Sequence, residues 1–149
     1  VYHAAGGELG AHGGSGPLWS GRLPATGDYV VRVRATGGPT AYTLAVQIPR
    51  RVVVDRENPS ASYAGAAPSR APVDFIIKGE QGRTLEVVLR SEDRPSHLHV
   101  YGLDDGIQLA PLADRRDRFA GRLPSTQDYV VSVVPWGEGA RYELLMTVR

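Results

Sequence analysis

The 149-residue sequence contains no cysteine, so disulfide bonds, thiolate catalysis and cysteine-based zinc sites are excluded. It also lacks a marked charge of either sign. Its 17 basic and 16 acidic residues leave a formal charge of +1, which is too little to indicate binding to nucleic acid or to an anionic membrane. No apolar run approaches the roughly 18 residues that would cross a membrane, and no segment shows a sustained helical apolar period. We therefore expect neither a membrane span nor a helical fold.

The same thirteen-residue phrase occurs twice, as GRLPATGDYVVRV from Gly21 and as GRLPSTQDYVVSV from Gly121, with ten identical positions. The match extends outward in both directions, so that residues 1–49 repeat residues 100–149. Internal repetition of this kind is typical of a duplicated structural unit. We predict that residues 1–49 form the C-terminal half of one repeat and that residues 50–149 form a complete repeat.

Apolar and polar residues alternate along most of the chain, a pattern that indicates β-strands with one face on a core. Turn signals such as Asn58-Pro59 and Gln81-Gly82 separate these stretches. Short strands with polar turns and no helices are typical of a sandwich or barrel. The predicted fold is all-β, an antiparallel β-sandwich of the jelly-roll kind, in which residues 1–49 superpose strand for strand on residues 100–149.

The alternation also predicts which side chains of the complete repeat are buried. They are Phe75, Ile77, Leu85, Val87, Leu89, Leu98, Val100, Tyr129, Val131, Val133, Tyr142, Leu144, Met146 and Val148.

Four stretches of the complete repeat resemble those of a known family: RVVVDRENPSASYAGAA, VDFIIKGEQGRTLEVVLRS, HVYGLDDG and GRLPSTQDYVVSVV. Their order resembles that of the periplasmic inhibitors of g-type lysozyme. The LPATGDYVVRV and AYTLAVQI stretches resemble the strand pair that closes bacterial pre-peptidase C-terminal type domains. Where the inhibitors have Ser-Gly before the turn tyrosine, this chain has Thr26-Gly27 and Thr126-Gln127.

Both families consist of small extracytoplasmic β-sandwiches. The resemblance therefore implies a non-catalytic binding module of a bacterium, periplasmic or secreted. It also implies a protein partner, such as a lysozyme or another hydrolase.

Residues suited to catalysis or metal binding do not converge in the sequence. His97 and His99 share one face of a predicted strand, but a zinc site needs a third ligand that nothing in the sequence brings near. Asp104-Asp105-Gly106 lacks the acidic ligands that a calcium loop would have downstream, so a hairpin turn is expected there. No GxSxG stretch is present to expose a serine nucleophile. We expect a non-enzyme without metal or organic cofactor, with both histidines facing solvent.

The loop PLADRRDRFAG, residues 111–121, is the main candidate for recognition, because its counterpart GAHGGSGPLWSG is rich in glycine and uncharged. Loops on rigid sandwiches often carry recognition, and arginine binds carboxylates with two parallel hydrogen bonds. In a lysozyme inhibitor such a loop would be able to reach the catalytic acids of the enzyme. The alternative is a solvated loop held by its own salt bridges. The candidate partner-binding residues are Asp104, Asp105, Asp114, Arg115, Arg116 and Arg118.

The incomplete repeat raises a separate question, because a half-sandwich exposes an apolar face and strand edges that proteins rarely leave bare. We expect that its other strands belong to an N-terminal segment that has been trimmed or not observed. Two alternatives stay open: the complete repeat covers the face, or strands from another chain complete it. In the last case the protein self-associates or serves as a structural subunit of an extracellular assembly.

Overall fold

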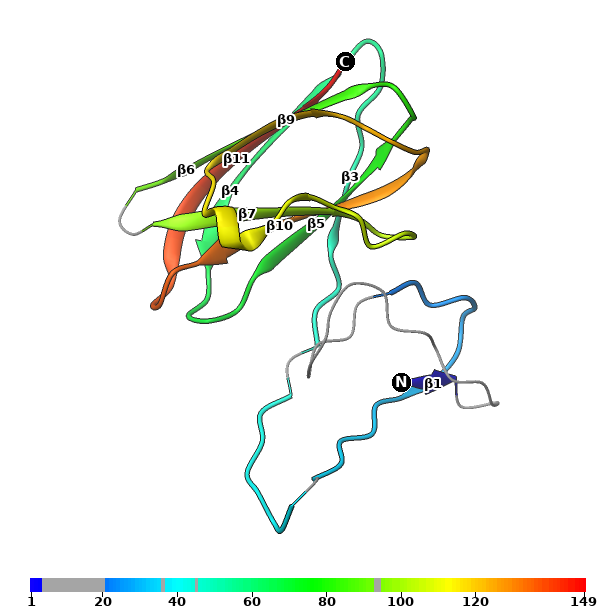
Figure 1. Ribbon diagram of the computed structural model, residues 1–149, viewed down its shortest axis with the longest axis vertical. Helices are drawn as coiled ribbons and strands as arrows, with labels where there is room; N and C mark the ends of the chain where they lie inside the picture. Colours follow the sequence, from blue (N-terminus) through cyan, green and yellow to red (C-terminus); the bar gives the residue numbers. More distant parts are fainter. Residues whose placement is uncertain (4–20, 36, 45, 93–94) are drawn as a thin grey trace. The chain divides into compact units, whose positions relative to one another are not determined.

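The computed structural model divides into two units, Val1–Gln47 (unit 1) and Ile48–Arg149 (unit 2), which are described separately (Figure 1). It describes residues 1–3, 21–35, 37–44, 46–92 and 95–149. Within these residues no helix is long and apolar enough to span a membrane.

Unit 2 consists of two layers of β-strands that face each other (Figure 1). The first sheet has the order β3 (Arg50–Val52), β5 (Val73–Gly79), β10 (Gln127–Pro135), β7 (Ser96–Gly102), β8 (Gln108–Ala110). The second has the order β4 (Ser60–Ala67), β11 (Ala140–Val148), β6 (Thr84–Ser91), β9 (Arg118–Arg122). All pairings in unit 2 are antiparallel except that of β3 with β5.

The predicted antiparallel β-sandwich is thereby confirmed. In the described part of the chain the one helical element is a single 3₁₀ turn, η1 (Leu112–Asp114). All fourteen side chains predicted to be buried are buried in the core.

Aromatic rings occupy the centre of this core. The Phe75 ring lies 5.0 Å from that of Tyr63 and 6.4 Å from that of Tyr142, between centroids. Such tilted and edge-on pairs add to the stabilisation that burial of the rings already provides. The core thus ties β5 of the first sheet to β4 and β11 of the second.

The repeated phrase forms the same turn in both units. The Tyr129 hydroxyl donates to the carbonyl oxygen of Ser125 at 2.7 Å and accepts from the backbone N–H of Ser125 at 3.3 Å. In unit 1 the Tyr29 hydroxyl makes the same two bonds to Ala25, at 2.5 and 3.2 Å. The tyrosine thus closes the turn that precedes its own strand, which explains why the phrase keeps its spacing in both copies.

The two short strands of unit 1 also keep the pairing register of unit 2. They are β1 (Tyr2–His3) and β2 (Tyr29–Val30). Tyr2 lies opposite Val30, and in unit 2 Tyr101 lies opposite Val130. The sequence match aligns Tyr2 with Tyr101 and Val30 with Val130, so equivalent residues face each other in both units.

The prediction that residues 1–49 superpose strand for strand on residues 100–149 is wrong. In the described residues of 1–49, no strand forms beyond β1 and β2. Six apolar side chains that were expected to face inward are 44% to 93% exposed: Val31, Val33, Tyr42, Leu44, Val46 and Ile48.

The physical reason is the absence of partner strands. In unit 2, β10 pairs with β5 and β7, and β11 pairs with β4 and β6. These four partners lie between residues 60 and 102, a stretch that residues 1–49 do not repeat beyond its last three positions. Those three positions correspond to Val1, Tyr2 and His3, of which Tyr2 and His3 contribute the one pairing that forms among the described residues of unit 1.

Candidate functional site

The charged loop after β8 crosses from the first sheet to the second, and both sheets hold its backbone. The carbonyl oxygen of Arg116 accepts from the N–H of Leu98 on β7 at 2.7 Å, and that of Asp117 accepts from the N–H of Leu89 on β6 at 2.8 Å. Arg115 ends η1 in the left-handed backbone conformation, with φ 51°. The loop therefore presents its side chains from a fixed backbone.

Arg115 lies against an exposed tryptophan. Its guanidinium carbon is 4.2 Å from the centroid of the Trp136 ring, and the His97 ring approaches the same tryptophan edge-on at 5.8 Å. Trp136 is 55% exposed, and its backbone N–H donates to the carbonyl oxygen of Pro95 at 3.0 Å. We call His97, Arg115 and Trp136 the Trp136 cluster. Tryptophan and arginine are the residues that most often dominate binding at protein interfaces.

The other charged residues of the loop have different surroundings. Arg116 forms an ion pair with Asp114 at 2.8 Å, with both side chains exposed. Arg118 begins β9 and lies opposite Val88 on the outer face of the second sheet. The alternative of a solvated loop held by its own salt bridges thus applies to Arg116, whereas the Arg115 side chain packs on Trp136.

Asp104 and Asp105 lie far from the Trp136 cluster, in the hairpin turn between β7 and β8 that the sequence predicts. β7 contains seven residues, so the turn and the cluster are separated by about 20 Å along the strand. The six predicted site residues therefore do not form a single site.

A hydrogen-bond network fixes this hairpin turn. Asp105 accepts from the N–H of Ile107 at 2.9 Å and from the Gln127 amide at 2.6 Å, and the Gln127 carbonyl oxygen accepts from the Asp104 N–H at 2.9 Å. Burial favours the neutral form of Asp105, but hydrogen bonds from Ile107, Gln127 and Ser125 outweigh it and hold the pKa of this carboxyl below its usual value. A Cβ at Gly102 would run into the side chains of Asp105 and Gln127. Gln127 thus links this turn to the one before β10.

Asp74, Ser132 and His99 lie side by side on the outer face of the first sheet, where Ser132 is opposite both of the others. Burial raises the pKa of Asp74, although a hydrogen bond with Ser132 and the charge of His99 act against it. Burial likewise lowers the pKa of His99, against the attraction of Asp74. Among the described residues, Asp74 Oδ1 and His99 Nε2 are buried without a hydrogen-bond partner.

These residue types also make up the hydrolase triad, but their order differs. In a triad the histidine lies between serine and aspartate and accepts the serine proton. Here the serine lies between the other two, so no proton path runs from serine through histidine to the carboxylate. The described residues also include no group of three or more histidine, aspartate or glutamate side chains that could hold a metal ion.

The prediction that both histidines face solvent is wrong in part. His97 and His99 do lie on the outer face of the sheet, yet both are only partly exposed. His97 packs on Trp136, and the His99 ring lies 4.8 Å from that of Tyr101.

Replacing Asp74 by asparagine is expected to raise the free energy of unfolding of unit 2 at pH 7 by about 1 kcal/mol. Because the folded-state pKa of Asp74 is raised, ionisation destabilises the folded protein increasingly as the pH rises through that pKa. Asparagine does not ionise and still offers an oxygen to Ser132. Urea unfolding across pH should show a difference that shrinks as the pH falls through the folded-state pKa and is absent below pH 3.8, the ordinary pKa of aspartate. A gain confined to acidic pH would contradict the assignment.

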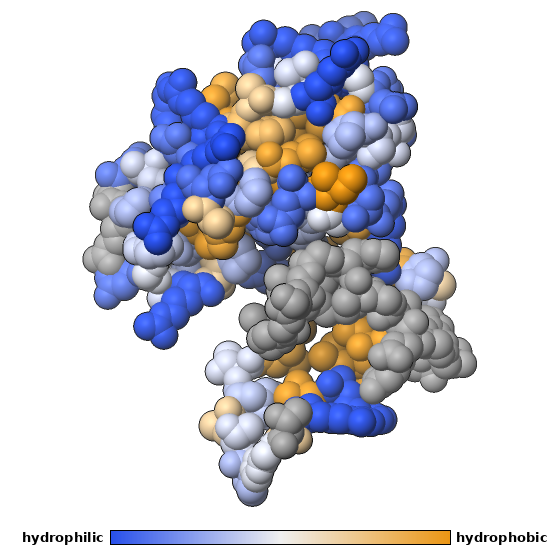
Figure 2. Space-filling view, in the orientation of Figure 1, coloured by the Kyte–Doolittle hydropathy of each residue, from blue (hydrophilic) through white to orange (hydrophobic). Residues whose placement is uncertain are grey.

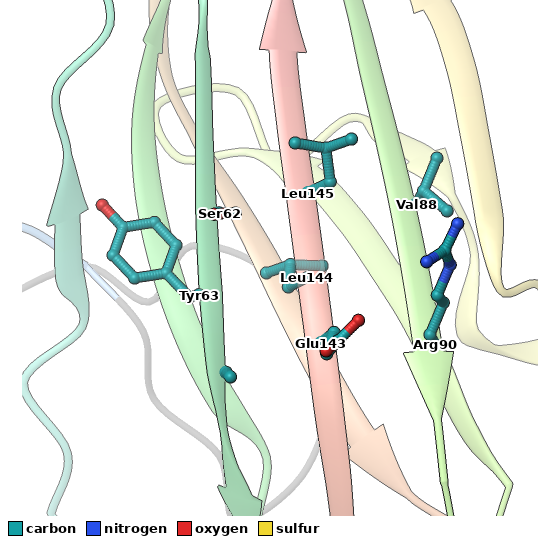
Figure 3. Close-up of a pocket in the computed structure, with 8 residues that line it drawn as sticks. Ser62, Tyr63, Val88, Arg90, Glu143, Leu144 and Leu145 are labelled. Carbon is teal, nitrogen blue, oxygen red and sulfur yellow. The ribbon is translucent and has the colours of Figure 1, made fainter.

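A shallow hollow lies on the outer face of the second sheet, across β4, β11 and β6 (Figure 3). Leu145 and Val88 form its apolar part, and Glu143 and Arg90 lie opposite each other in the pairing of β11 with β6. The hollow is open to solvent. It carries one acid and one base on a flat sheet, an arrangement that suits a surface contact better than catalysis.

No family model matches the chain, and no curated protein does either. Solved structures do match. The periplasmic inhibitor of g-type lysozyme from Aeromonas hydrophila, PliG, is 15% identical with a TM-score of 0.56, covering 68% of this chain and 96% of that one. A mutant of the Escherichia coli PliG is 17% identical with a TM-score of 0.52, covering 68% and 97%. The chain shares their fold.

The Salmonella Typhimurium PliG is also similar in structure, with 14% identity and a TM-score of 0.50, covering 66% of this chain and 96% of that one. The inhibitor-like order of strands predicted from the sequence is thus matched by solved structures. The resemblance to pre-peptidase C-terminal type domains has no such support and stays a prediction.

Proposed function

We propose that this protein is a non-catalytic, extracytoplasmic binding module of a bacterium, whose protein partner is a g-type lysozyme or a similar secreted hydrolase. The fold shared with three periplasmic inhibitors of g-type lysozyme supports the class of function. Fold alone does not specify a partner. The observation that carries the proposal is the exposed Trp136 with Arg115 stacked on it.

The Trp136 cluster suits a partner that presents carboxylates. Stacking on the indole ring restrains the Arg115 side chain and leaves guanidinium N–H groups available for two parallel hydrogen bonds to a carboxylate. The backbone bonds of Arg116 and Asp117 hold the loop in place, so little conformational freedom would be lost on binding. Glycoside hydrolases cleave with paired carboxylates, which such a surface would complement.

The test is the lysis of bacterial cell walls by a g-type lysozyme in the presence of the protein at micromolar concentration. Wild type should inhibit, and replacing Arg115 and Arg116 together by alanine should weaken inhibition by about 30-fold or more, as expected for loss of about 2 kcal/mol at an interface hot spot. Trp136→Ala should have a similar effect.

Arg90→Ala is the matched control, because it removes an arginine from the hollow on the second sheet and should leave inhibition unchanged. Unchanged lysis with wild type would exclude lysozyme as the partner. Inhibition that survives the double replacement would retain the function and place the contact elsewhere.

A second function is favoured by unit 1, whose apolar side chains at strand positions are exposed. In that case the protein is a structural subunit of an extracellular assembly, and strands from another chain complete its half-sandwich. Native mass spectrometry of the purified protein and of its natural complexes would reveal such a chain.

A further inference from the structure

We propose that the free edge of β4 binds an extended segment of a partner protein, which adds a strand to the second sheet and carries an aspartate or glutamate that pairs with Arg50. The proposal concerns unit 2 alone. It goes beyond the function proposed above, whose contact is the Trp136 cluster, and does not depend on it.

Among the described edge strands of unit 2, β4 alone carries no protection against pairing with a further strand. Edges are usually protected by shortness, by charged side chains or by proline. β3 and β8 have three residues each, and β9 has an arginine at both ends. β4 has eight residues, and its sequence SASYAGAA contains neither a charge nor a proline. In contrast, hydrophilic side chains cover much of the face of unit 2 drawn in Figure 2.

The backbone of β4 offers a regular row of hydrogen-bonding groups at this edge. The Val148 N–H donates to the Pro59 carbonyl oxygen at 2.9 Å, one position before the pairing of β4 with β11 begins. Opposite residues of antiparallel strands alternate between hydrogen-bonded and non-bonded pairs. The odd-numbered residues of β4 therefore bond to β11, and the even-numbered ones direct their N–H and C=O groups to the free edge. These are Ser60, Ser62, Ala64 and Ala66.

Arg50 places a positive charge beside this edge. It lies opposite the buried Phe75 in the pairing of β3 with β5, and its guanidinium carbon is 4.6 Å from the centroid of the Tyr63 ring. Figure 3 shows that ring on the side of β4 away from β11. Burial raises the pKa of the Tyr142 hydroxyl, and the nearby charge of Arg50 opposes the rise. Arg50 thus reaches from the edge of the first sheet to the edge of the second.

The charge of Arg50 is suited to a carboxylate of another chain. Its neighbour Arg51 pairs with Asp128, whereas no acidic side chain of the described residues forms an ion pair with Arg50. Stacking on Tyr63 restrains the side chain and leaves N–H groups for two parallel hydrogen bonds. In a strand added to β4, the residue opposite Tyr63 lies on the same face as Tyr63. An aspartate or glutamate at that position therefore meets Arg50.

A second copy of this chain fits the edge less well. Its β4 contains no acidic residue to pair with Arg50. Two-fold pairing of β4 with β4 would also bring a second Arg50 toward the first, because both lie beside the middle of the strand. Charge complementarity therefore favours an acidic segment of a different protein.

The test titrates the full chain with a capped seven-residue peptide of alternating threonine and valine, in which glutamate replaces the central valine. NMR titration up to about 1 mM should show binding about tenfold tighter than that of the same peptide with glutamine, because a charge-assisted hydrogen bond is the stronger one.

Amide exchange provides a readout that depends on the alternation along β4. At the highest peptide concentration the exchange of Ser62 and Ala64 should slow about tenfold, because their N–H groups become bonded. Exchange of Ala61 and Tyr63, which already bond to β11, should not change. Loss of this alternation would contradict the addition of a strand.

Charge exchange at Arg50 supplies the matched variants. Arg50→Gln should bind the glutamate and glutamine peptides equally, and Arg50→Glu should prefer a peptide with lysine at its centre about tenfold. Arg122→Glu, on the opposite edge of the same sheet, should leave the preference of wild type unchanged. Ala64→Pro removes an N–H from the free edge and should weaken all three peptides. Urea unfolding verifies that each variant is folded.

Three results would overturn the proposal. Equal affinity of wild type for the glutamate and glutamine peptides would exclude an acidic partner. Absence of binding and of amide protection up to about 1 mM would exclude the edge as a docking site. Protection of the same amides that rises with protein concentration, without any peptide, would show that a second copy occupies the edge instead.

Discussion

Replacing Tyr129 by alanine is expected to lower the free energy of unfolding of unit 2 by about 4 kcal/mol. Tyr129 has no exposed surface, and it lies on the central strand of the first sheet. Its loss leaves a cavity in the core and removes the hydroxyl that closes the turn at Ser125. Urea unfolding followed by tryptophan fluorescence measures the change. Tyr129→Phe, which keeps the ring, should cost about 1 kcal/mol.

Tyr29→Ala is the matched control, because Tyr29 occupies the same place in the same phrase and makes the same bonds to Ala25. Its strand lacks the partners that bury Tyr129, so the unfolding of unit 2 should change by less than about 0.5 kcal/mol. Equal losses from the two replacements would show that unit 1 unfolds together with unit 2. They would contradict the view of unit 1 as an incomplete half.

The strands and core of unit 2 could be predicted because alternation specifies which face of a strand is apolar, and every strand finds its partners within residues 50–149. The same alternation in residues 41–48 led to a wrong prediction. An alternation of period two indicates which side chains of a strand share a face. It does not indicate which other strand pairs with that strand. Val46 and Met146 fit the pattern equally well, and one is exposed where the other is buried.

The candidate site could be predicted only in part for a similar reason. The difference in charge between the two copies pointed to the loop that carries Arg115. Trp136 contributes from the next hairpin, and only the fold brings the two together. One signal was available: the first copy has Thr36 where the second has Trp136. The neighbours Asp74 and His99 required the register of three strands, which no local pattern supplies.

Replacing Arg51 by alanine is expected to lower the free energy of unfolding of unit 2 by about 2 kcal/mol. The Asp128 side chain is 6% exposed and that of Arg51 is 55% exposed. Removing the arginine leaves a buried carboxylate without the partner that binds both of its oxygens. Breaking a fully buried pair costs about 3–5 kcal/mol, and the exposure of Arg51 reduces this figure. The hydrogen bond with Asp128 also raises the pKa of Arg51 above its ordinary value.

Arg116→Ala is the matched comparison, because the ion pair of Arg116 has the same length as that of Arg51 but is more exposed to solvent. Arg116 and Asp114 are also 2.8 Å apart, but their side chains are 54% and 37% exposed, so its loss should cost less than about 0.5 kcal/mol. Combining Arg51→Ala with Asp128→Asn should recover part of the loss, because the amide is not a buried charge. Similar losses from Arg51→Ala and Arg116→Ala in urea unfolding would mean that water reaches Asp128. The carboxylate would then no longer require an arginine at the edge strand.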